Sequence, residues 1–214
     1  MIQQIVLYTD GACIGNPGPG SWAYVFPHAS ATVEASGGVS QTTNNQMELT
    51  AAIKGLDATP VGSVVELVTD SQYVVKGMTE WLAGWLRNSW RNGKKEPVAN
   101  RALWEQLVAV AGARSVAWRW VKGHVDADAG GDRWNHRCDE LASAQAVEAA
   151  AAAIAHGQRV TSACIAMASN GRVWRWPATI LDHARGGLVC ATHALAATGA
   201  AMAPPREDAY HRRG

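Results

Sequence analysis

Cysteine is scarce in this sequence, and the few cysteines present are widely spaced. The 214 residues include only Cys13, Cys138, Cys164 and Cys190, and no two of them form a CxxC motif. Zinc and redox sites usually use closely spaced cysteines, so reduced thiols in a cytoplasmic protein are the simpler expectation. The histidines and cysteines beyond residue 155 also lack the spacing of a zinc site.

Long apolar runs are also missing. No segment approaches the roughly 20 consecutive apolar residues that a membrane-spanning helix requires, so we expect no membrane partner. The chain starts directly with a strand pattern and no basic region, so we expect no signal peptide. Hydrophobic residues nevertheless make up 48% of the sequence, which is enough for a sizeable core. This length and composition predict one globular domain, alone or with an appendage.

Lysine is absent from the last quarter of the chain. Residues 156–214 carry seven arginines and three acidic residues, a net charge of +4, whereas residues 1–155 have a net charge of −3. The shift predicts a boundary near residue 155, with a catalytic domain at 1–155 and a C-terminal extension at 156–214. The extension contains an Arg/Trp run at 172–176. It is interpreted either as a weakly ordered segment or as an accessory nucleic-acid surface, and its pattern assigns it no role.

Hydrophobic periodicity and turn residues predict an α/β domain. Strands are predicted at 5–8, 21–26, 31–39, 64–69 and 116–121, and helices at 44–57, 71–78, 81–90, 101–111 and 133–155. The first three strands would form an antiparallel meander. The helix at 44–57 would then connect the first strand to a parallel neighbour at 64–69.

Four acidic residues occupy positions where a lone charge is costly. Asp10 and Asp70 follow apolar strand runs, while Glu48 and Asp139 have apolar residues at helical spacing and should face the sheet. Each one singly fits a salt bridge, a cap or a turn. All four together, without matching cations, indicate a divalent metal site. Oxygen ligands favour Mg²⁺ over Zn²⁺, which prefers His and Cys.

Five ordered motifs resemble type 1 ribonuclease H of bacteria. They are YTDGA at 8–12, TNNQMEL at 43–49, TDSQYV at 69–74, WVKGH at 120–124 and NHRCDELA at 135–142. The resemblance covers residues of about 2–150. It implies a ribonuclease H-like α/β fold, in which a mixed five-stranded sheet (an antiparallel meander plus parallel strands) has helices on both faces.

The same resemblance implies an endonuclease that cleaves the RNA strand of RNA/DNA hybrids with two Mg²⁺ ions, for which Mn²⁺ is a possible substitute. The products would carry 5′-phosphate and 3′-hydroxyl ends. The implied metal ligands are Asp10, Glu48, Asp70 and Asp139. His124 matches a loop histidine that assists proton transfer or product release, and its ordinary pKa suits a proton shuttle near neutral pH.

Substrate contacts are also implied by the resemblance. The residues that match contacts to sugars and bases around the cut are Asn16, Asn44, Asn45 and Gln72. Cys13 matches a position whose backbone lies near the RNA, and Thr43 and Asn100 match a pocket for a DNA phosphate. A second group of substrate contacts matches a basic protrusion that grips the DNA strand. These residues are Trp81, Trp85, Arg87, Trp90 and Arg91. Taken without the resemblance, the amides fit turns and caps, and the tryptophans fit a core as well as a nucleic-acid ledge.

This sequence departs from the family pattern at several positions. Gln41 and Gln46 replace arginines that are common in bacterial relatives, which predicts weaker phosphate binding with the chemistry retained. The loop 125–134 is longer than usual and carries Asp126, Asp128 and Asp132, so it can alter how His124 moves. We expect a monomer with no obligate protein partner. The rival functions are a non-catalytic hybrid-binding module and another nuclease on the same scaffold, such as a junction resolvase.

Overall fold

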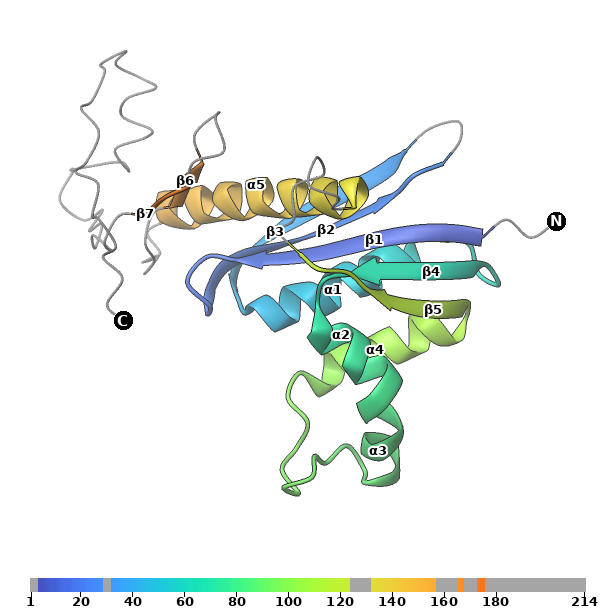
Figure 1. Cartoon of the computed structure of the whole chain (residues 1–214). Helices are drawn as coiled ribbons and strands as arrows, with labels where there is room; N and C mark the ends of the chain where they lie inside the picture. The colour runs from blue at the N-terminus through green and yellow to red at the C-terminus, as the bar shows by residue number, and fades with distance from the viewer. Residues whose placement is uncertain (1–3, 29–31, 124–131, 157–164, 168–172, 176–214) are drawn as a thin grey trace, which may run out of the picture. The chain divides into compact units, whose positions relative to one another are not determined.

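The structure, a computed structural model, describes residues 4–28, 32–123, 132–156, 165–167 and 173–175 (Figure 1). The chain divides into two compact units, Met1–Ser162 and Ala163–Gly214. In the second unit, β6 (Ile165–Met167) and β7 (Val173–Arg175) pair antiparallel. The predicted boundary near residue 155, between the catalytic domain and the C-terminal extension, stays a prediction. The role of the extension also stays a prediction, and most of its residues lie outside the described ones.

The first unit is built on a mixed five-stranded sheet. Its strands are β1 (Gln4–Cys13), β2 (Gly18–Phe26), β3 (Val33–Thr42), β4 (Val64–Thr69) and β5 (Ser115–Trp120). The order across the sheet is β3-β2-β1-β4-β5. The first three strands pair antiparallel, and β4 pairs parallel with both β1 and β5. The predicted meander followed by a parallel crossover is therefore confirmed.

Helices cover both faces of this sheet, as predicted (Figure 1). They are α1 (Asn44–Asp57), α2 (Gln72–Lys76), α3 (Leu82–Arg87), α4 (Arg101–Gly112) and α5 (Arg133–Ala155), with a π-helical turn, η1 (Gly77–Trp81), between α2 and α3. The predicted helix at 81–90 was too long, because α3 ends at Arg87. Ser89 and Trp90 adopt positive φ angles of 52° and 61°, which end the helical path.

Two hydrophobic cores form because neighbouring residues of a strand point to opposite faces of the sheet. Leu7 of β1 packs in the core that contains α1 and α4, where Trp104 is fully buried. Tyr8, the next residue, packs in the core under α5, together with Cys138 and Ala142. The sheet is thus fixed between α1 and α4 on one side and α5 on the other.

Side-chain caps fix the starts of the helices that lie closest to the acidic residues. Thr43 caps α1 in a reciprocal box with Gln46, so the helix begins at the predicted residue. Ser71 caps α2 by accepting from the Val74 N–H, and Asp132 caps α5 by accepting from the Trp134 N–H. Each cap satisfies a backbone donor at a helix N-terminus and sets the helical register.

Strand β1 is longer than its apolar run predicts. Its parallel ladder with β4 ends at Tyr8↔Val68, but its antiparallel ladder with β2 continues to Cys13↔Gly20. Asp10 therefore lies inside a strand, opposite Ala23, and not at the strand end where the sequence pattern placed it. At Asp10, β1 is therefore paired with β2 only, because the parallel ladder with β4 ends two residues earlier.

Among the described residues, none of the helices combines the length and the apolar character needed to cross a bilayer.

Candidate active site

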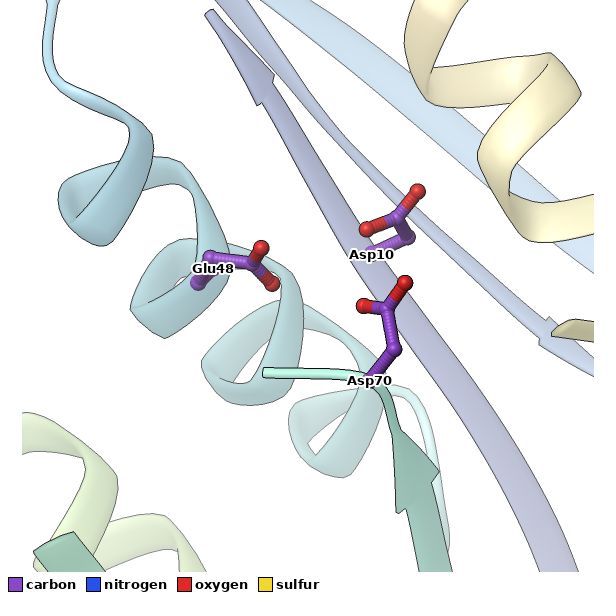
Figure 2. A group of neighbouring side chains, drawn as sticks. All are labelled: Asp10, Glu48 and Asp70. Carbon is purple, nitrogen blue, oxygen red and sulfur yellow. The ribbon is translucent and has the colours of Figure 1, made fainter. Parts of the chain in front are cut away.

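Three acidic side chains meet where β1, α1 and β4 come together. Asp10 comes from β1, Glu48 from the second turn of α1, and Asp70 from the residue after β4. One carboxylate oxygen from each lies within 4.8 Å of those from the other two. Figure 2 shows the three carboxylates directed toward one another. Residues that are far apart in the sequence thus form one cluster.

Burial makes this cluster electrostatically unusual. Asp10 and Glu48 are only 6% and 7% exposed. Desolvation raises the pKa of Asp10 well above its ordinary value, and the charges of Asp70 and Asp139 raise it further. Desolvation also raises the pKa of Glu48, followed by the charges of Asp10 and Asp70. Both carboxyl groups therefore favour protonation unless a cation offsets their charge.

Asp139 belongs to the same neighbourhood but not to the group of three. It lies on α5, and its charge and a side-chain hydrogen bond both raise the pKa of Asp10. One of its oxygens accepts a hydrogen bond from Ser143 at 3.5 Å. The structure thus places the other three predicted acidic residues around Asp10. It brings three of the four within ligand distance of one another.

Two glycines make the cluster possible, and sequence reasoning missed both of these roles. A Cβ on Gly11 would overlap the backbone of Met47 and Glu48, so its absence lets α1 approach β1. A Cβ on Gly123 would overlap the carboxylate of Asp70. Both glycines lie within motifs of the sequence. The need for a residue without a Cβ, however, depends on which atoms pack against them in the fold.

The donor set fits a divalent cation that takes oxygen ligands. Glu48 Oε1 accepts a hydrogen bond from the Asn44 side chain at 3.4 Å. Glu48 Oε2 is buried and has no hydrogen-bond partner among the described residues. A buried carboxylate oxygen without a partner, beside two further carboxylates, is what an oxygen-seeking cation would satisfy.

Polar amides are hydrogen-bonded to the acidic cluster through Glu48. The backbone N–H of Asn44 donates to the Asn16 side chain at 3.0 Å, so Asn16, Asn44 and Glu48 form one hydrogen-bonded chain. Asn45, on α1, and Gln72, on α2, are exposed. Cys13 is half-buried, and its thiol donates to the carbonyl oxygens of Gly18 and Thr42 at 3.7 and 3.6 Å.

Gln46 connects the two residues of the predicted phosphate pocket. Its Oε1 accepts from the Thr43 N–H at 3.1 Å, and its Nε2 donates to Asn100 Oδ1 at 3.4 Å. Asn100 in turn donates to the Tyr73 hydroxyl at 3.3 Å. Thr43 and Asn100 are therefore neighbours, and Gln46 lies between them.

The tryptophans of the predicted protrusion form an aromatic cluster. Trp85 lies 5.8 Å from Trp81, 6.2 Å from Trp90 and 5.1 Å from Trp104, measured between ring centroids. Trp85 and Trp90 pack against the core that contains Leu7, so packing is at least part of the role of these two residues. Arg87 and Arg91 are exposed at the same segment. His124, and residues 125–131 of the predicted long loop, lie outside the described residues.

Comparisons with known proteins agree with this geometry. The sequence model of the RNase H family matches residues 2–147. Ribonuclease H of Bordetella bronchiseptica is 51% identical over 148 residues, which cover 69% of this chain and 92% of that protein. Ribonuclease HI of Neisseria meningitidis serogroup B is 47% identical over 148 residues, covering 69% and 99%. Ribonuclease H of Geotalea uraniireducens is 49% identical over 141 residues, covering 66% and 92%.

Solved structures agree as well. LC9-RNase H1, described as a type 1 RNase H with the type 2 active-site motif, superposes with a TM-score of 0.59 at 29% identity. That match covers 69% of this chain and 74% of the other. The N-terminal RNase H domain of a Mycobacterium tuberculosis protein superposes with a TM-score of 0.54 at 25% identity, covering 70% and 98%. Family match, identity and fold together show that this chain is an endoribonuclease and belongs to the ribonuclease H family, in its bacterial type 1 group.

Proposed function

We propose that this enzyme hydrolyses the RNA strand of RNA/DNA hybrids, and that Mg²⁺ is its cofactor. The observation that carries the proposal is the group of Asp10, Glu48 and Asp70, whose carboxylate oxygens converge within 4.8 Å. The products would have 5′-phosphate and 3′-hydroxyl ends. The residues responsible would lie in a catalytic domain formed by residues 1–155, acting as a monomer in the cytoplasm.

The four carboxylates Asp10, Glu48, Asp70 and Asp139 would hold two Mg²⁺ ions, with Mn²⁺ as a substitute. When bound, such a pair of ions offsets the charge on the attacking and departing oxygens of an in-line phosphodiester displacement. Asp10 is the central ligand in this proposal, because the charges of Asp70 and Asp139 both act on it.

The chain's own residues prepare this site in three ways. The hydrogen bond from Asn44 occupies Glu48 Oε1 and leaves Oε2 for a cation. The Gly11 N–H donates to Asp10 Oδ1 at 2.8 Å and fixes that carboxylate relative to β1. The imidazole of His124 would accept or return a proton at the scissile phosphate, a role that stays a prediction.

Hybrid selectivity would come from the amides beside the acidic cluster. A hybrid presents 2′-hydroxyl groups on its RNA strand along a wide, shallow groove. Asn16, Asn44, Asn45 and Gln72 can each donate and accept hydrogen bonds to these hydroxyls and to base edges. Cys13 would contribute its backbone near the RNA strand.

The DNA strand would lie on the other side of the site. Thr43 and Asn100, which Gln46 joins, would bind one of its phosphates. The protrusion would contribute charge from Arg87 and Arg91, and ring surface from Trp81, Trp85 and Trp90. Because a neutral amide replaces arginine at residue 46, this phosphate subsite would bind weakly.

A parallel cleavage assay tests the proposal. End-labelled RNA/DNA, RNA/RNA and DNA/DNA duplexes are incubated with the full-length protein, with Mg²⁺ or with a chelator. We expect internal cuts in the RNA of the hybrid only, and only with the metal. Binding without any cut would favour the non-catalytic hybrid-binding module, and cleavage of a DNA-only substrate such as a junction would favour another nuclease on this scaffold.

A further inference from the structure

Trp120, at the end of β5, is a large aromatic residue that the cores do not require. Its surface is 45% exposed, whereas Trp118, two residues earlier on the same strand, packs against the core around Leu7. The indole N–H of Trp120 is nevertheless fixed, because it donates to the backbone carbonyl oxygen of Asp70 at 2.9 Å. An exposed ring tied to a residue of the acidic cluster suggests a role other than packing.

The position of Asp70 in the chain explains why this hydrogen bond can affect the acidic cluster. The ladder between β4 and β5 ends with the pair Thr69↔Trp120, and Val121 N donates to Thr69 O at 3.0 Å. Asp70 follows at once, in the turn that leads to Ser71, the N-cap of α2. Its carboxylate must therefore be oriented by a turn and not by a strand.

The turn is held on both sides of Asp70. Ser71 N donates to Thr69 Oγ1 at 3.1 Å, which spans the acidic residue along the chain. Trp120 adds a hydrogen bond to the carbonyl of Asp70 itself. Gly123 lies so close to the Asp70 carboxylate that a Cβ there would overlap Oδ2. The end of β5 and the residues after it thus contact Asp70 at both its backbone and its side chain.

We infer that Trp120 is a positioning residue, which orients the Asp70 carboxylate by holding the Asp70 carbonyl through its indole N–H and so sets the affinity of the site for divalent cations. The inference rests on the proposed function, in which Asp70 is a metal ligand. The carbonyl carbon and the Cβ of Asp70 are both bonded to its Cα, so a displacement of the main chain at Asp70 would carry the carboxylate away from Asp10 and Glu48. The indole hydrogen bond to the Asp70 carbonyl opposes that displacement.

The variant Trp120→Phe tests this role because it keeps an aromatic ring and removes the N–H. Mn²⁺ binding to the full-length protein is measured by calorimetry, together with the metal-free melting temperature and with kcat and KM on a hybrid. We expect the Kd for Mn²⁺ to rise about 3- to 10-fold, as for the loss of one hydrogen bond. Added metal should restore kcat, KM for the hybrid should stay unchanged, and the metal-free melting temperature should fall less than in the Trp118→Phe control.

Trp118→Phe is the matched control on the same strand. It removes part of a core side chain, so it should lower the melting temperature and leave the Mn²⁺ affinity unchanged. An unchanged Mn²⁺ affinity in Trp120→Phe overturns the inference. A melting temperature lowered in Trp120→Phe as much as in the control also overturns it, since the role would then be structural.

Asp70→Asn separates this inference from the proposed function. If it binds Mn²⁺ as the wild type does, Asp70 is not a ligand, and both the metal assignment and the inference fail. If Asp70→Asn loses affinity while Trp120→Phe does not, the inference alone fails.

Discussion

Gly11 on β1 lies directly against the backbone of Glu48 on α1, at a distance that leaves no space for a Cβ. This contact brings the buried carboxylate of Glu48 beside that of Asp10, which is adjacent to Gly11 in the sequence. The close approach of a helix and a strand, and not a loop, therefore sets the distance between these two acidic side chains.

The first prediction concerns this contact. Gly11→Ala should push α1 away from β1, lower the free energy of unfolding by about 1–3 kcal/mol, and reduce activity more than stability alone explains. Gly84→Ala is the control, because no other atom lies within 4 Å of a Cβ placed there and α3 gains a better helix former. Chemical denaturation and a cleavage assay measure both effects. Full activity in Gly11→Ala would show that the site tolerates a wider spacing.

The second prediction concerns the charge of Asp10. Its pKa is raised in the folded protein, so its contribution to stability is present at acidic pH and is lost as the pH rises through the folded-state pKa. Without metal at pH 7, the free energy of unfolding of Asp10→Asn should therefore exceed that of the wild type. The advantage should shrink toward pH 4 and also in saturating Mg²⁺, which offsets the charge in the wild type.

The same variant should lose activity by about 10³-fold or more, because several kcal/mol of metal-derived stabilisation would be removed. Thermal melts with Mg²⁺ and with a chelator measure the stability of Asp10→Asn, and a cleavage assay run in parallel measures its activity. A variant that is inactive and no more stable than the metal-free wild type would indicate that the carboxylates do not repel one another.

The third prediction concerns Tyr8, which lies on the α5 side of β1. Its hydroxyl donates to Asp132 Oδ2 at 3.1 Å, and burial followed by the charge of Asp132 raises its pKa to about 12. The stability that this neutral hydroxyl contributes is present below about pH 10, the ordinary pKa of tyrosine. It should be lost as the pH rises toward 12.

Tyr8→Phe isolates this effect. The difference in unfolding free energy between the wild type and Tyr8→Phe should shrink between about pH 10 and pH 12, as measured by urea denaturation at several pH values. Tyr8 as a whole is only 6% exposed in the wild type, so Phe should fit the same space. A constant difference across this range would contradict the assigned hydrogen bond.

The fourth prediction separates packing from nucleic-acid binding in the protrusion. Trp85 contacts three other tryptophans, so Trp85→Ala should lower the free energy of unfolding by about 2–4 kcal/mol. Arg87→Gln should leave the free energy of unfolding unchanged. It should reduce the magnitude of the slope of log binding constant against log salt concentration by about 0.9, the value for one phosphate contact. Hybrid binding at several salt concentrations measures the slope.

Arg87 is a cleaner probe than Arg91 in this test. Arg91 Nη1 donates to the carbonyl oxygen of Lys95 at 2.7 Å, so its removal would also disturb the loop. An unchanged salt slope in Arg87→Gln would mean that this arginine does not contact the hybrid.

The sequence predicted the parts of the structure that depend on local patterns. The helix at 44–57 begins and ends at its predicted residues, with Thr43 and Gln46 forming its capping box, and the meander and parallel crossover are observed as predicted. The end of α3 was not predictable in this way. It depends on positive φ angles at Ser89 and Trp90, which are residue types that rarely adopt them.

The acidic residues were predictable, but their exact neighbours were not. The motifs led to Asp10, Glu48 and Asp70, which the structure brings together. The need for Gly123 depends on the Asp70 carboxylate that lies against it, and the role of Trp120 depends on a carbonyl fifty residues earlier in the chain. Such requirements arise from tertiary contacts, and residue spacing alone does not contain them.

The unequal lengths of the two ladders of β1 affect how the enzyme would take up its cofactor. Asp10 is anchored to β2 by strand pairing, while the ladder to β4 has already ended. The backbone of this central carboxylate is therefore rigid before any ion arrives, so little conformational entropy is lost on binding. Removal and rebinding of the metal ion should then be rapid and reversible, because neither step requires the sheet to refold.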